Sequence, residues 1–359
     1  MSLILRCPHL SILFAFAITV CVAPLAYAND SAASTAVGGL KLTREARVSM
    51  QKERLTIGDK RVHVEYEFLN ETDADITTDV AFPIPEYGLD LDQVIPAFDD
   101  FHVWVEGKPF DYQIDTKAIC RGADLTVLLR KAGVDISSFG HFDFKSYSSP
   151  DISRLSPQQQ EELVKAGLIN IKDKFPQWSV HKTYHWSQTF PARQILHVSH
   201  EYKPVIGFMP VSTGDLDAKL RAKRVADAML ARQRDPKDPK GWYIQAAKDI
   251  EAVCVEPGLQ RQLESEARAN PRKHAVFEDG TEPIEMRWVD YILTTANTWK
   301  TPIKDFELVV ERPEANSEWH WCVSFCWDGP IERPTPDRFV VHVKDFVPQR
   351  ELRIGFLGL

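Results

Sequence analysis

Short segments in which apolar and polar residues alternate are the feature that most restricts the fold of this chain. Arg61–Leu69 alternates over its whole length, which is typical of a strand with one buried face. Ile76–Phe82 predicts a second strand, which ends at Pro83 because proline cannot donate a ladder hydrogen bond. Further strands, the first two as a hairpin, are predicted at Phe101–Val105, Phe110–Ile114, Trp178–Thr189, Arg193–Tyr202, Glu285–Thr294, Asp305–Glu311, Trp319–Trp327, Arg338–Val343 and Glu351–Phe356.

Helical signals interrupt the strands in the middle of the chain. Asp124–Lys131 predicts a short helix, and Ser156 is a predicted N-cap because proline follows it at the first helical position. Longer helices are predicted at Asp215–Arg232 and Gly258–Asn270. The sequence therefore predicts a mainly β fold with inserted helices (α+β) and an antiparallel β-sandwich-type core.

The order of these signals divides the chain into six predicted segments. One domain and two are both compatible with this order, since domains commonly contain roughly 100–200 residues. The segments are a signal peptide (1–28), an N-terminal β region (29–120), a helical insertion (121–177), a β-hairpin (178–210), a helical segment (211–284) and a C-terminal β region (285–359).

The first 28 residues have the three parts of an export signal. Arg6 is the basic part, Ser11–Leu25 is an apolar run, and Ala26–Ala28 is a small-x-small cleavage site. An uncleaved membrane anchor is the alternative, but the run is shorter than the roughly 20 residues that span a bilayer. A lipoprotein would need Cys21 as its lipidated residue, and the bulky Val20 precedes it. We expect cleavage after Ala28, a periplasmic location and no transmembrane segment in the mature chain.

The charge and composition narrow the classes of function. The net charge is −8, so the chain has no general attraction for nucleic acid or anionic lipid. Hydrophobic residues make up 44% of the chain and charged residues 26%, as in ordinary globular proteins. These values argue against a disordered, collagen-like or coiled-coil protein, and nucleic acid is not an expected partner.

Four cysteines remain after the predicted cleavage: Cys120, Cys254, Cys322 and Cys326. An even number in an oxidising compartment favours disulfide bonds, and buried free thiols are the alternative. Four cysteines allow three pairings. Cys322 and Cys326 would lie about 13 Å apart in an extended strand, which is too far for a bond. No C-x-x-C motif is present, so a thioredoxin-type redox centre is not predicted.

The standard catalytic signatures are missing from the sequence. It contains no G-x-S-x-G elbow, no phosphate-binding G-x-x-x-x-G-K-[ST] loop, no H-E-x-x-H helix and no dinucleotide-binding glycine pattern. Acidic residues are numerous, but no spacing singles out an acid–base pair. We therefore predict neither a catalytic residue nor a cofactor.

Histidines in the segment Trp178–Tyr202 form the best candidate for a metal site. If the two strands pair with His185 opposite His197, then His181 faces Glu201 on the same side of the sheet. Imidazole and carboxylate groups of this kind are ligands for zinc or copper. Solvent-facing polar strand residues are the alternative, and a shift of one residue in register would destroy the arrangement.

Three tryptophans near the C-terminus form a candidate binding surface. Trp319, Trp321 and Trp327 all occupy odd-numbered positions. Because side chains alternate along a strand, the three share a face if the strand is regular. An exposed row of this kind stacks on sugar rings or docks a partner. Core packing beside a disulfide is the alternative.

The order of local patterns resembles a family of exported bacterial proteins catalogued as domain of unknown function 4424. The resemblance implies an exported protein and brings no catalytic residues. The matching patterns run through almost all of the chain after the signal, at Gly38–Leu42, Val64–Asp73, Val80–Pro85, Gln188–Ala192, His200–Pro204, Tyr291–Thr295, Trp299, Pro302–Ile303, Val323–Cys326 and Asp345–Pro348.

The same resemblance implies one disulfide bond. Relatives place cysteine at the positions of Cys254 and Cys326, which makes this the preferred pair, whereas Cys120 and Cys322 look like additions whose pairing is doubtful. A bridge that closes about 70 residues stabilises a protein by roughly 4 kcal/mol in the chain-entropy model.

The sequence as a whole predicts a non-enzymatic binding or envelope-associated structural protein, whose partner is an envelope protein or a ligand. A metal-dependent or acidic-cleft hydrolase is the alternative.

Overall fold

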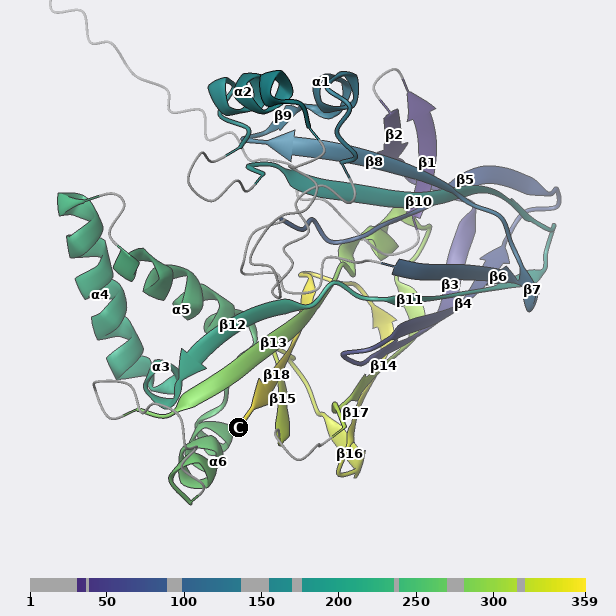
Figure 1. The fold of residues 1–359 in the computed structure, drawn as a ribbon. Coiled ribbons are helices and arrows are strands. Elements are labelled where there is room, and N and C mark those ends of the chain that lie inside the picture. Colours follow the sequence, from purple (N-terminus) through teal and green to yellow (C-terminus); the bar gives the residue numbers. More distant parts are fainter. Residues whose placement is uncertain are drawn as a thin grey trace, which may run out of the picture.

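A computed structural model describes residues 31–36, 39–88, 99–136, 155–169, 176–235, 239–269, 281–314 and 320–359. The predicted signal peptide lies outside these residues. The described strands form three sheets of six, eight and four strands, and they are accompanied by six α-helices (Figure 1). The predicted mainly β fold with inserted helices is therefore confirmed.

Two of the sheets form the main body of the protein. The six-stranded sheet has the order β2-β1-β5-β10-β8-β9, and the eight-stranded sheet has the order β16-β17-β14-β3-β4-β11-β6-β7. The first contains β1 (Ser31–Ala36), β2 (Gly39–Leu42), β5 (Ile76–Pro83), β8 (Gln113–Cys120), β9 (Ala123–Asp124) and β10 (Ser179–Phe190). The second contains β3 (Val48–Ile57), β4 (Val62–Asn70), β6 (Asp99–Val105), β7 (Lys108–Pro109), β11 (Ile195–Lys203), β14 (Ile303–Glu311), β16 (Glu332–Thr335) and β17 (Arg338–Phe346).

These two sheets pack face to face around a shared aromatic core (Figure 1). The rings of Phe82 on β5 and Tyr184 on β10 stack on Phe101 of β6, with centroid distances of 5.8 and 4.1 Å. His200 on β11 is fully buried, and its ring lies 4.5 Å from Phe82 and 5.3 Å from Tyr66. The inward positions of both sheets thus fill one sandwich core.

The third sheet carries most of the helices. The helices α3, α5 and α6 lie against one face of it, and α4 packs on the outer side of α5 (Figure 1). A second cluster of buried residues, including Val211, Ile250, Leu263 and Met286, lies between α3, α5 and α6 and the sheet. The sheet has the order β12-β13-β18-β15 and contains β12 (Gly207–Ser212), β13 (Pro283–Tyr291), β18 (Leu352–Gly358) and β15 (Trp321–Phe325). The helices are α3 (Thr213–Leu216), α4 (Ala218–Arg234), α5 (Trp242–Ala252) and α6 (Pro257–Ala269), with 3-10 turns η2 (Pro239–Gly241) and η3 (Thr294–Thr298).

The close approach of the helical layer to the four-stranded sheet depends on one glycine. A Cβ atom added at Gly355 of β18 would lie 2.8 Å from Cγ1 of Val253, directly after α5. Real Cβ atoms do not approach other heavy atoms this closely, so only glycine permits the observed packing at this point.

Two short helices cover the six-stranded sheet at its β8–β9 end (Figure 1). They are α1 (Thr126–Lys131) and α2 (Pro157–Lys165). Ser156 caps α2 as predicted, because its hydroxyl accepts the Gln159 backbone N–H and the Gln159 side chain accepts the Ser156 N–H. None of the helices in the described part of the chain combines the length and apolar character needed to span a membrane.

The predicted hairpin over residues 178–210 does not form. The strand β10 pairs with β5 and β8 in one sheet, whereas β11 pairs with β4 and β6 in the other. The buried Asn70 holds this corner, since its side-chain amide donates to the Phe190 carbonyl at 2.9 Å and to the Ala74 carbonyl at 2.8 Å. The chain therefore crosses between layers after β10, next to the place where it crosses after β4.

Candidate functional site

A hollow of about 350 Å³ lies where edges of two sheets approach α6, and we call it the β15 groove. The strands β15 and β16 are the outermost strands of the four-stranded and eight-stranded sheets, respectively. This volume falls within the range of small-ligand sites. The groove is lined by Cys254, Glu256, Leu259, Gln262, Arg312, Trp321, Cys322, Val323, Ser324, Phe325, Ile331, Arg333 and Phe339.

The outer edge of β15 presents backbone groups to the groove. His320 and Leu359 exchange both backbone hydrogen bonds at 3.1 Å, so every second residue from His320 onward points its N–H and C=O toward β18. The residues between them, including Val323 and Phe325, point these groups away from β18. Within the described residues, no hydrogen bond is made by the outward backbone groups of Val323 and Phe325.

The sequence of β15 lacks the devices that normally protect a sheet edge. Trp321–Phe325 contains no proline, lysine or other charged residue, although these are the usual means by which proteins prevent pairing at an edge. By contrast, β16 at the other edge carries Glu332, Arg333 and Pro334. The β15 edge therefore remains chemically competent to pair with another strand.

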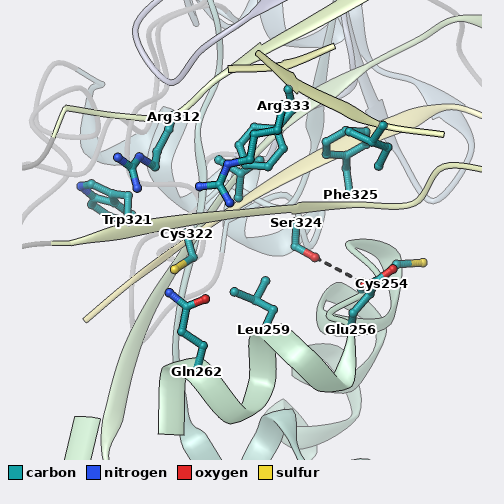
Figure 2. A pocket seen from close by; sticks show the side chains of 13 residues that line it. Cys254, Glu256, Leu259, Gln262, Arg312, Trp321, Cys322, Ser324, Phe325 and Arg333 are labelled. Carbon is teal, nitrogen blue, oxygen red and sulfur yellow. Dashed lines mark hydrogen bonds between the residues drawn. The ribbon is translucent and has the colours of Figure 1, made fainter. Parts of the chain in front are cut away.

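One side of the groove is cationic and aromatic. Figure 2 shows Arg312, Arg333 and Phe325 on the same side of β15. Arg312 forms an ion pair with Asp337. Arg333 donates to the Pro336 carbonyl at 2.9 Å, and its guanidinium carbon lies 5.0 Å from the centre of the Phe339 ring. Among the described residues, Arg333 has no carboxylate partner, so its charge is available to a ligand.

The other side of the groove is more neutral. Leu259 and Gln262 extend from α6 toward Cys322 (Figure 2). The hydroxyl group of Ser324 donates to the carbonyl oxygens of Val253 and Cys254 at 2.9 and 3.1 Å. This contact anchors β15 to the turn between α5 and α6, and Glu256 is the acidic residue on this side.

A disulfide bond stabilises the same corner of the molecule. Cys254 and Cys326 are bonded, with Cα atoms 5.0 Å apart and a sequence separation of 72. This is the pair that the resemblance to the family implies. Cys120 and Cys322 carry free thiols.

The free thiol in the groove is not an activated nucleophile. Burial raises the pKa of Cys322 above its ordinary value, and the Glu266 carboxylate acts in the same direction, whereas Arg312 and Arg333 oppose it. A raised pKa keeps the group in its thiol form at neutral pH, and the thiolate is the reactive species. The arrangement favours binding over covalent chemistry at this position.

The structure does not bring the candidate metal ligands together. His181 and His185 lie on β10 in the six-stranded sheet, while His197 and Glu201 lie on β11 in the eight-stranded sheet. His197 instead lies 3.2 Å from Glu106. The predicted facing of His185 with His197 is wrong, because β10 and β11 do not pair.

The remaining two members of the set also have partners of their own. The imidazole of His181 lies 3.0 Å from Glu86, and this hydrogen bond holds the pKa of the Glu86 carboxyl below its ordinary value. Glu201 lies 3.6 Å from His63 and 3.5 Å from Arg61. In the described part of the chain, no cluster of three or more His, Cys, Asp or Glu side chains is arranged to hold a metal.

The predicted row of tryptophans is not a single exposed surface. Trp321 is 5% exposed, and the Arg287 guanidinium lies 4.7 Å from its ring. Trp327 lies beyond the end of β15 and packs on Phe306 and Phe346. Trp319 lies outside the described residues. The strand ends before Trp327, so shared parity does not put it on the face of Trp321.

Sequence reasoning missed the two arginines of the groove and the unpaired edge of β15. Arg312 and Arg333 are separated along the chain by β15, and only the folded structure brings them to one side of it. The uncharged, proline-free sequence Trp321–Phe325 was the one local signal of an unprotected edge.

A family model described as "Domain of unknown function (DUF4424)" matches residues 28–354 of the chain. No curated protein matches the chain. A solved structure described as a "putative nutrient binding protein" from Legionella pneumophila is 12% identical, with a TM-score of 0.36. That comparison covers 92% of this chain and 71% of the other.

Proposed function

The chain belongs to the DUF4424 family, and we propose that this member is an exported, non-enzymatic binding protein whose β15 groove receives an extended peptide segment of a partner protein. The partner strand would lie beside β15 and extend the four-stranded sheet by one strand.

The observation that carries this proposal is the outward backbone edge of β15 within a preformed hollow. Val323 and Phe325 each present one N–H donor and one C=O acceptor there. An extended peptide satisfies such groups by strand addition, in which backbone hydrogen bonds supply affinity and side-chain pockets supply specificity. An isolated small molecule would satisfy them less completely.

The two sides of the groove suggest which peptide fits. Side chains of an added strand point alternately to opposite faces. One set would face Arg312 and Arg333, which favour acidic residues, and the other would face Leu259 and Cys322, which favour small apolar residues. The preferred partner segment therefore alternates acidic and apolar side chains.

The alternative hydrolase hypothesis has no support from the arrangement of its candidate residues. Its metal-dependent form required His181, His185, His197 and Glu201 on one face, and these residues lie in two different sheets. Its acidic-cleft form named no residues that the structure could bring together. The location is part of the proposal. The apolar Ser11–Leu25 run and the Ala26–Ala28 cleavage pattern support export, and a periplasmic compartment would suit the Cys254–Cys326 bond.

Peptide binding tests the proposal directly. The probe is a fluorescein-labelled seven-residue peptide in which valine and glutamate alternate, and the readout is fluorescence anisotropy. Val323→Pro removes the outward N–H without removing a bond to β18, and we expect it to weaken binding at least about tenfold. Val323→Ala is the matched control, because it loses a similar amount of packing but keeps the N–H.

A second control acts on the peptide. N-methylation of alternate residues blocks hydrogen bonding along one edge of the peptide and leaves its side chains unchanged. The methyl groups can be placed on the odd or on the even residues, and one of these two peptides should lose binding. Circular dichroism must show that both Val323 variants are folded. Equal affinity of Val323→Pro and Val323→Ala, or no binding of the unmethylated peptide at millimolar concentration, would overturn strand addition.

A further inference from the structure

A second cavity, of about 500 Å³, lies beside the same disulfide but shares no lining residue with the β15 groove. Cys326 lines this cavity, whereas Cys254 lines the groove. Its walls come from β17, the segment 347–352 and the segment 326–330 that follows β15. The cavity volume is within the usual range for small-molecule sites.

The inner wall of the cavity is aromatic. Trp327 and Phe346 line it, with ring centroids 5.6 Å apart. Both rings pack on the fully buried Phe306, at 6.1 and 4.6 Å. Val343 and Leu352 complete the apolar surface. Because Phe306 supports both rings from within the core, the wall is preformed and does not need a ligand to assemble.

The rim of the cavity is charged, and its basic groups are weakly held. Arg350 pairs with Asp328 at 3.0 Å, and the two side chains are 51% and 90% exposed. An ion pair this exposed is only weakly stabilising, so a competing anion can take the place of Asp328. Lys344, also on the rim, pairs with Asp305 at 2.8 Å and is 74% exposed.

Glu351, the second acidic group that lines the cavity, is already engaged. Glu351 accepts hydrogen bonds from the Leu293 N–H at 2.8 Å and from the Thr294 hydroxyl at 2.6 Å. Its oxygens are directed to the start of η3 and do not repel an anion at the rim as strongly as a free carboxylate would. Lys344 and Arg350 thus outnumber Asp328 as the charged groups that face a ligand at the mouth.

We propose that this cavity binds a small amphipathic anion, an aliphatic or aromatic carboxylate whose apolar body packs on Trp327 and Phe346 and whose carboxylate pairs with Arg350. Burial of the apolar body against the two rings supplies most of the affinity. The charge-assisted bond to Arg350 orients the ligand and selects anions over cations. The inference is independent of peptide binding in the β15 groove.

Isothermal titration calorimetry with sodium decanoate below its micelle concentration tests the inference. Gly329→Leu fills the cavity, because a Cβ atom there lies 3.4 Å from Nε1 of Trp327 in ordinary contact. We expect it to weaken decanoate binding at least about tenfold. Gly58→Leu is the matched control at a distant glycine whose nearest neighbour to an added Cβ lies at 3.6 Å, and it should bind decanoate like the unmodified protein.

The charge requirement is tested separately. Arg350→Gln should weaken decanoate binding roughly five- to tenfold, the loss expected for one charge-assisted hydrogen bond, and should leave the binding of neutral decanol unchanged. Absence of saturable decanoate binding, or unchanged binding in Gly329→Leu, would overturn the site. Decylammonium binding as tight as decanoate binding would overturn its anion preference.

Discussion

At the scale of single residues, Glu351 shows how burial and hydrogen bonding compete at one carboxyl group. Burial raises its pKa above the ordinary 4.5, although the Thr294 hydroxyl and the backbone N–H groups of Thr294 and Leu293 act in the opposite direction. Desolvation disfavours the charged form, and hydrogen bonds to the carboxylate favour it. The net direction means that the folded protein holds this proton more tightly than the unfolded chain does.

This direction predicts a specific pH dependence. A raised folded-state pKa contributes stability below the unfolded value, and the contribution is lost as pH rises through the folded pKa. The stability of the unmodified protein relative to Glu351→Gln should therefore decrease as pH rises from about 4 toward 7. Urea unfolding of both proteins across this range measures the difference. A relative stability that increases with pH would contradict the assignment.

At the scale of elements, the Cys254–Cys326 bond joins the turn after α5 to the end of β15. It closes a separation of 72 residues that includes α6, β13 and β14. The chain-entropy model assigns a bond of this separation about 4 kcal/mol. Because Ser324 also donates to the carbonyls of Val253 and Cys254, the bond and this contact together position β15 against the helical layer.

Replacement of both cysteines by serine should therefore lower the free energy of unfolding by about 4 kcal/mol. Denaturant titration under oxidising conditions is the measurement. Cys120→Ser is the control, because this unbonded cysteine is only partly buried, and its loss should cost less than about 1 kcal/mol. If dithiothreitol leaves the unfolding midpoint of the unmodified protein unchanged, the bond has no such role.

At the scale of the whole molecule, strands from the two ends of the chain share one sheet. The strand β14 pairs in parallel with β3, with Leu308 opposite Leu55, and antiparallel with β17. The sandwich core also contains rings from both ends, since Trp299 lies 4.6 Å from Phe68. The N-terminal β strands consequently depend on the C-terminal ones for their hydrogen bonds and for their core.

A fragment that ends at residue 284 should therefore fail to fold. It would lack β14 and almost all of β13. This loss leaves β3 paired on one side only, leaves β12 without its neighbouring strand, and exposes the Phe68 side of the core. Nuclear magnetic resonance spectroscopy of residues 29–284 should show poor amide dispersion and no cooperative unfolding. A dispersed spectrum with a cooperative transition would mean that the N-terminal part is an independent domain.

Local sequence patterns were sufficient to predict the elements with strong periodicity or capping. Ser156 caps α2, and the predicted helix at Gly258–Asn270 corresponds closely to α6 (Pro257–Ala269). The local patterns did not predict the helix α5, the strand β12 or the central strand β3. Alternation and caps act between neighbours in the chain, so they can be recognised without knowledge of the fold.

Which strands lie side by side, by contrast, depends on the packing of the whole chain. Alternation in β10 and β11 indicates that each strand has a buried face. It does not identify the partner strand, because backbone N–H and C=O groups can pair with those of any strand. The buried Asn70 corner directs the two strands into different sheets and separates His185 from His197. The same lack of partner information hides the β15 edge and the approach of Arg312 and Arg333, because a groove exists only once distant segments have packed together.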